Sequence, residues 1–176
     1  MIDAGPDAPL LIPAADTVLL QLAHPDAERC RAELAAFAEL ELSPDHVHTF
    51  RLGDLGLWNA RSAGLDAEQV IDVLDRHSSG PVPHATLTLV ADTMARFGRV
   101  VLEGGGGGCP LSLRTDTPEL LDELRSEPDV APHLGERTGP DTATVAAERR
   151  GPLKQALVAR RLPADDRAAV NPGLAL

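Results

Sequence analysis

Residues Leu102–Pro110 read LEGGGGGCP, and a glycine-rich loop is one way for a backbone to hold a phosphate. A Walker loop requires GxxxxGK followed by Ser or Thr, placed between a strand and a helix, and its lysine neutralises phosphate charge. Here Gly108 is followed by Cys109 and Pro110, and the only lysine, Lys154, lies far downstream. A dinucleotide loop requires GxGxxG at the start of a helix, whereas a strand is expected next. We therefore expect a flexible hairpin tip and no nucleotide cofactor.

Two histidines, His46 and His48, fall on the same side of a predicted strand, and this spacing can hold a metal ion. No nearby Cys or carboxylate completes a ligand set, and Asp45 is expected on the opposite face. Because two ligands rarely fix a metal, we expect packing or surface roles and no metal site.

His77 precedes Ser78 and Ser79, an order that would suit a base and a nucleophile. Neighbours in sequence seldom face each other, and the chain has no strained elbow of the GxSxG type. The residues therefore give no catalytic group, and we expect this region not to be an enzyme by itself.

Trp58, the only tryptophan, has two interpretations. A lone Trp on a helix usually anchors a core, because its ring buries a large area. An exposed ring would instead stack on a nucleic-acid base. We expect the core role.

Five basic residues lie within thirteen positions: Arg149, Arg150, Lys154, Arg160 and Arg161. At about 100° per residue, Arg150, Lys154 and Arg161 would share one side of a helix and could meet a DNA backbone. Three apolar residues would then face the core: Leu153, Leu157 and Val158. The alternative is a solvated face on which Arg160 and Arg161 only favour the helix C-terminus.

The elements that would position these residues follow from apolar spacing. Residues 15–22 and 46–52 are predicted to be strands, and residues 24–40 a helix between them. Three short-linked helices are expected within 53–98, with Asp54 and Asp66 as N-caps. The strands at 99–103 and 111–115 would then form a hairpin, which gives the order of a winged-helix module. A helix at 117–127, a strand at 142–147 and a helix at 148–161 complete the chain.

The predicted fold class is α/β of the α+β type: a strand–helix–strand unit (1–52), a winged-helix-like part (53–98) and a ββαβα part (99–165). Residues 166–176 would be a linker. The net charge of −11 argues against coating nucleic acid by charge alone, and the first fifty residues carry nine acids and two bases. Two cysteines, no long apolar run and no signal peptide predict a reduced cytoplasmic protein without membrane contact.

One long stretch of the chain closely resembles the region before the motor in actinobacterial XPB-type DNA repair helicases. It reads FAELELSPDHVHTFRLGDLGLWNARSAGLDAEQVIDVLDRHSSGPVP and continues to DTMARFGRVVL. The wider helicase-associated XPB/Ssl2 N-terminal domain shares its looser pattern. The resemblance runs from about Leu11 to Pro163, although the glycine run departs from it.

The resemblance implies a superfamily II helicase whose two motor domains hydrolyse ATP and move 3′ to 5′ on DNA. Those motors supply the Walker lysine, the acid box and the arginine finger, which this chain lacks. The last residues resemble the approach to the first motor. We therefore expect a non-catalytic N-terminal accessory region that engages DNA, docks a repair partner or regulates the motor domains. The alternative is a standalone protein-interaction module without DNA binding.

Overall fold

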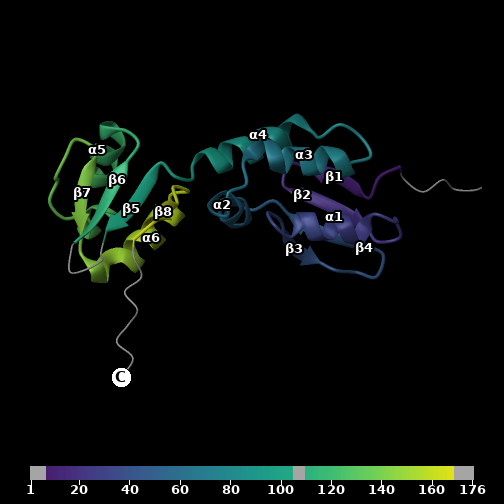
Figure 1. Ribbon diagram of the computed structural model, residues 1–176, viewed down its shortest axis with the longest axis horizontal. Helices are drawn as coiled ribbons and strands as arrows, with labels where there is room; N and C mark the ends of the chain where they lie inside the picture. The colour runs from purple at the N-terminus through teal and green to yellow at the C-terminus, as the bar shows by residue number, and fades with distance from the viewer. Residues whose placement is uncertain (1–6, 105–109, 169–176) are drawn as a thin grey trace, which may run out of the picture. The chain divides into compact units, whose positions relative to one another are not determined.

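The computed structural model describes residues 7–104 and 110–168, which divide into two units, Met1–Ala95 and Arg96–Leu176 (Figure 1). Each unit combines a four-stranded sheet with helices, so the predicted α+β class is confirmed. The glycine run from Gly105 to Cys109 and the greater part of the expected linker, residues 169–176, lie outside the described residues.

The first unit is built on an antiparallel sheet in the order β1-β2-β4-β3. Its elements are β1 Leu10–Ala14, β2 Thr17–Gln21, α1 Ala27–Leu34, β3 Glu39–Leu42, β4 Val47–Arg51, α2 Asp54–Ser62, α3 Ala67–His77 and α4 His84–Ala95. The strand–helix–strand order predicted for residues 15–52 is present as β2, α1 and β4, and two further strands extend the sheet on either side.

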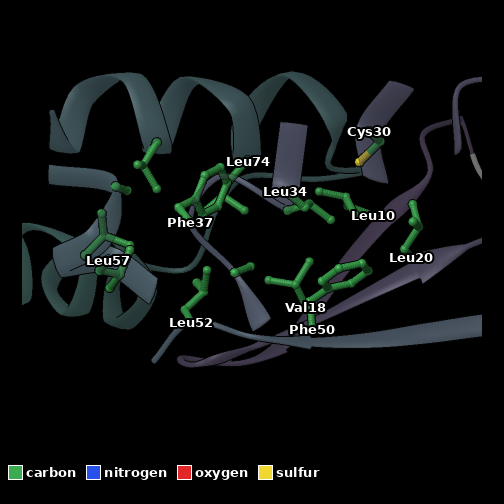
Figure 2. Packing of buried hydrophobic residues seen from close by; sticks show 14 of the residues in the cluster. Leu10, Val18, Leu20, Cys30, Leu34, Phe37, Phe50, Leu52, Leu57 and Leu74 are labelled. Carbon is green, nitrogen blue, oxygen red and sulfur yellow. The ribbon is translucent and has the colours of Figure 1, made fainter. Parts of the chain in front are cut away.

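One face of this sheet forms the core, because side chains alternate along each strand. Val18 of β2 is opposite Phe50 of β4, and Leu20 is opposite His48, with all four buried. Figure 2 shows residues of these strands gathered with Leu34 of α1 and other apolar side chains in one cluster. The helices α1 to α4 and the sheet therefore share a single core.

The predicted helix at 24–40 is too long at its C-terminal end. Helix α1 ends at Leu34, and residues 39–42 form strand β3. The sequence ELEL alternates with the period of a strand, and Leu40 pairs with Phe50 of β4. Leu40 is 47% exposed, so its helical spacing from Phe37 does not mark a common buried face.

Strand β1 lies at an edge of the sheet, which explains how it contains Pro13. An edge strand tolerates a proline because one side of its backbone needs no partner in the sheet. Beyond β1, the pairing continues among the described residues only as a parallel bridge from Leu10 to Ser78.

Of the two predicted N-cap residues, Asp66 caps its helix and Asp54 does not. The Asp66 carboxylate accepts from the backbone N–H of Gln69, whose side chain accepts from the N–H of Asp66, forming a capping box. Asp54 is the first residue of α2, and Gly53 occupies the cap position. An acidic side chain in the first turn still suits the positive end of the helix dipole.

The second unit is a sheet in the order β7-β6-β5-β8. Its elements are β5 Val100–Gly104, β6 Leu111–Thr115, α5 Pro118–Ser126, the 3₁₀ turns η1 Ala131–His133 and η2 Ala147–Arg149, β7 Thr142–Val145, α6 Arg150–Ala159 and β8 Ala164–Asp166. Strands β5 and β6 pair antiparallel as far as Gly104 and Leu111. These two strands therefore pair as the predicted hairpin requires.

Strand β8 is absent from the sequence prediction, which placed Asp166 in the linker. It pairs in parallel with β5, and Arg167 N–H donates to Leu102 O at 2.8 Å. Leucines of α5 and α6 pack with Leu102 and Leu113 of the sheet in the core of this unit.

A winged-helix arrangement remains a prediction. Helices α2, α3 and α4 share their core with the first sheet, whereas the β5–β6 hairpin belongs to the second unit.

Candidate functional site

The basic residues predicted to contact DNA do not form one open surface. Arg150 donates two hydrogen bonds to Asp166, from Nε at 3.0 Å and from Nη2 at 2.9 Å. Lys154 Nζ lies 2.8 Å from the same carboxylate. Helical spacing does bring Arg150 and Lys154 together, but their shared partner is an acid of β8.

Asp166 is held ionised by these partners. Its partial burial pushes the pKa upward, but hydrogen bonds and charge from Lys154 and Arg150 outweigh this and hold the pKa of Asp166 below its ordinary value. The side chain of Asp166 is only 12% exposed. The three residues therefore join α6 to β8 as a partly buried ion cluster.

Arg160 is also neutralised, but by a different pair of acids. Its Nε lies 3.1 Å from both carboxylate oxygens of Asp129, and its Nη2 lies 2.5 Å from Glu127 Oε2. The hydrogen bond from Arg160 lowers the pKa of Asp129. Arg160 therefore ties the end of α6 to the segment after α5.

Two details of the predicted helix face are wrong. Arg161 lies beyond the end of α6 with a φ of 56°, so helical spacing does not carry it to the side of Arg150 and Lys154. Val158 is 43% exposed, whereas Leu153 and Leu157 are buried as predicted. Arg149 is exposed, and its guanidinium has no ion-pair partner among the described residues.

Trp58 is a core anchor, as expected. It is 4% exposed, and its Nε1–H donates to the carbonyl oxygen of Thr93 at 2.9 Å, which links α2 to α4. A ring in this position cannot stack on a base.

The two histidines of the predicted pair differ in their exposure to solvent. His46 is exposed just before β4, whereas His48 is buried beside Phe50 with 6.5 Å between ring centroids. Within residues 7–104 and 110–168, no group of three or more His, Cys, Asp or Glu could hold a metal ion.

His77 and its neighbouring serines contact different partners. His77 Nε2 lies 3.2 Å from Glu33 Oε2, and Ser79 Oγ donates to Leu10 O at 3.3 Å. The Ser78 hydroxyl is buried and has no hydrogen-bond partner in the described part of the chain. This arrangement is structural, because His77 faces a carboxylate of α1 and not a nucleophile.

Glu33 is the centre of a network that sequence reasoning did not identify. Its carboxylate contacts Arg29 at 3.2 Å, Arg76 at 3.0 Å and His77 at 3.2 Å, which joins α1 to α3. Partial burial pushes its pKa upward, but the hydrogen bonds from His77 and Arg29, with the nearby charges, hold the pKa of Glu33 below its ordinary value.

Beside this network, two adjoining pockets of about 190 and 430 Å³ follow α3. They share Leu65, Gln69 and Val73, and we call them together the α3 groove. The apolar spacing predicts that Val73 points inward, but it is only half-buried and lines the groove. The sequence signal for this groove is weak: Val73 lies between Asp72 and the Leu74–Asp75 pair on a predicted helix.

No helix among the described residues is long and apolar enough to cross a membrane.

Comparison with known proteins gives one family and several relatives. Residues 10–139 match the family described as helicase conserved C-terminal domain. Over 170 residues the chain is 49% identical to the DNA 3′-5′ helicase XPB of Kineococcus radiotolerans, covering 95% of this chain and 30% of that protein. The DNA 3′-5′ helicase XPB of Mycobacterium tuberculosis is 44% identical over 168 residues, with the same coverage. The Saccharomyces cerevisiae general transcription and DNA repair factor IIH helicase/translocase subunit XPB/SSL2 is 32% identical over 95 residues, which are 53% of this chain and 11% of that protein. The chain thus spans about 30% of the length of its bacterial relatives.

Proposed function

The chain belongs to the helicase conserved C-terminal domain family, and from this premise we propose that it is a non-catalytic accessory region of an ATP-dependent 3′-5′ DNA helicase of the XPB type, acting in DNA repair. The observation that carries the proposal concerns Lys154. Nearly the whole chain aligns with a third or less of a helicase, yet its only lysine, on α6, is bound to Asp166 of β8. A motor needs a lysine free to meet phosphate.

We also propose that this region precedes the motor domains. The family description refers to a C-terminal helicase domain, but the 176 residues contain neither a GxGKT loop nor a DEAH-type acid box. Since both signatures belong to the ATP-binding part of the motor, a region that lacks them lies outside that part. The resemblance of the last residues to the approach to the first motor supports the same order.

Charge favours a docking or regulatory role for the first unit. Residues 1–95 carry fifteen acidic and five basic side chains, whereas residues 96–176 carry twelve acidic and eleven basic ones. A strongly acidic unit repels a DNA backbone and attracts a basic protein surface. We assign partner docking or motor regulation to the first unit on this basis.

The test is a chimera. In the K. radiotolerans helicase, the matched segment is replaced by this chain, and DNA-dependent ATP hydrolysis and unwinding are compared with those of the same helicase lacking the segment. We expect the chimera to recover the coupling of ATP hydrolysis to unwinding that the truncated enzyme loses. A chimera that behaves like the truncated helicase would favour the standalone interaction module.

DNA contact at the start of α6 is a second candidate. It is favoured by Arg149, which is exposed in the more nearly neutral unit and has no ion-pair partner among the described residues. Replacing Arg150 or Lys154 is a poor test, because either change also breaks the cluster with Asp166. We expect Arg149→Glu to weaken DNA binding at low salt and to reduce the slope of log affinity against log salt by about one.

The matched control is Arg61→Glu, an exposed arginine in the last turn of α2. It changes the net charge equally but lies in the acidic unit. Equal DNA affinity for both variants and the wild type would rule out the α6 contact.

A further inference from the structure

The α3 groove is lined at its base by buried apolar side chains, and its mouth is open to solvent. Phe37 and Val70 form the floor and are 2% and 1% exposed. Leu65 and Val73 form the walls and are half-buried. Figure 2 shows Phe37 within the core cluster, so the floor is fixed by the packing of the unit. Apolar walls that remain in contact with water favour an apolar occupant.

The rim of the groove is acidic. Four acids line it, namely Glu33, Asp66, Glu68 and Asp72, against one base, Arg76. Arg76 already pairs with both Glu33 and Asp72. Glu68 is exposed and has no ion pair with a described residue. The rim therefore keeps a negative charge that complements a cationic partner.

The dimensions suit a helix. The groove extends along α3 from Asp66 to Arg76, roughly 15 Å at 1.5 Å per residue. About three turns of a second helix would match this length and place apolar side chains at i, i+3 and i+4 over the floor. An extended nucleic-acid strand fits poorly, because its phosphates would face the acidic rim.

We propose that the α3 groove docks an amphipathic helix of a partner protein, with its apolar face against Leu65 and Val73 and its Lys or Arg side chains against the rim. The groove would be the place where the first unit docks its partner. Only this link to partner docking rests on the proposed accessory function. Binding combines apolar burial with a charge contribution that salt screens.

The experiment uses the full 176-residue chain and a fluorescent 14-residue peptide, LKKLLKLLKKLLKL, with LEELLELLEELLEL as the anionic counterpart. We expect the cationic peptide to bind, the anionic peptide to bind at least tenfold more weakly, and 0.5 M NaCl to weaken the cationic complex. Val73→Arg should reduce the affinity at least tenfold. The control Val158→Arg introduces the same charge on the exposed face of α6 and should leave the affinity unchanged.

Glu68→Arg provides a second variant if Val73→Arg fails to fold, because Glu68 is exposed. It should lower affinity for the cationic peptide at least threefold at low salt. Unchanged affinity in a folded Val73→Arg or in Glu68→Arg would overturn the proposal. Equal binding of both peptides would also overturn it. A wild-type dimer that Val73→Arg dissociates would overturn it too, because the occupant would then be a second copy of the chain. The chimera assay does not depend on this peptide, so failure here would leave the accessory function standing.

Discussion

Single residues in this chain show how burial decides between chemistry and structure. Cys30 is fully buried on α1, and burial, with the charges of Glu33 and Asp26, raises the pKa of its thiol to about 12. A thiol that stays protonated at neutral pH is a weak nucleophile, so Cys30 acts as a small core residue. Trp58 likewise places its ring in the core.

We predict that Trp58→Phe lowers the free energy of unfolding by about 1–3 kcal/mol, because it removes a buried hydrogen bond and leaves Thr93 O without its donor. Urea unfolding followed by far-UV circular dichroism measures the change. Phe37→Leu is a useful comparison, since it removes ring volume from the same core but no hydrogen bond. Equal stability of Trp58→Phe and the wild type would contradict the buried contact.

A second residue-scale prediction concerns acid. Because the folded-state pKa of Glu33 lies below its ordinary value of 4.5, its ion pairs stabilise the fold above that pH. This stabilisation is lost as the pH falls through the folded pKa. We therefore expect the stability difference between wild type and Glu33→Gln to be largest near pH 6 and to shrink by pH 3.

Urea unfolding at pH 6, 4.5 and 3 gives this difference. The control Glu68→Gln removes an exposed acid of α3 and should show little pH-dependent difference. A difference for Glu33→Gln that stayed constant with pH would show that its ion pairs add nothing to stability.

At the scale of elements, helix α2 is placed by a close approach of its backbone to the end of the α1 segment. A Cβ on Gly56 would lie 2.7 Å from the carbonyl oxygen of Phe37. Backbone cannot move aside as a flexible side chain can, so glycine is required here for packing and not for its φ angle. For Gly151, on α6, such a Cβ would have no atom within 4 Å apart from its chain neighbours and the backbone of its own helix.

These two glycines predict opposite effects of one substitution. Gly56→Ala should destabilise the first unit by about 1–3 kcal/mol through overpacking. Gly151→Ala should stabilise α6 by up to about 1 kcal/mol through helix propensity. Thermal unfolding followed by Trp58 fluorescence reports the first unit, and circular dichroism reports both units. A stabilising Gly56→Ala would mean that α2 can shift away from Phe37.

At the scale of the whole molecule, two units of similar construction carry different charge. The acidic first unit contains the α3 groove, and the second unit contains the basic side chains that the sequence suggested for DNA. Three of those five residues form ion pairs within the second unit, namely Arg150, Lys154 and Arg160, and the first two share the single carboxylate of Asp166.

We predict that the 176-residue chain neither binds nor hydrolyses ATP. The physical reason is the absence from the sequence of a phosphate-binding loop with a free lysine. Equilibrium binding of a fluorescent ATP analogue and a DNA-stimulated ATPase assay measure both activities, with a blank purification as control. ATPase activity above the blank that follows the protein through size exclusion would refute the prediction.

The sequence by itself determined the features that depend on neighbouring residues. Thr117 and Pro118 begin α5, and the Asp66 cap begins α3, because a cap contacts groups only two or three residues away. The buried Trp58 and the absence of a Walker lysine were also readable from the residues alone. Such signals need no knowledge of the fold.

Only the tertiary structure decided which distant groups meet. Asp166 reaches Arg150 because β8 pairs with β5, and Asp129 reaches Arg160 across 31 positions of the chain. These contacts place three of the five predicted DNA-contact residues in ion pairs within the second unit. The α3 groove likewise exists only where Phe37, after the end of α1, lies beside Val73 of α3. Strand pairing and helix packing join residues that are far apart in the sequence. The spacing of residues along the chain does not show which of these distant residues will meet.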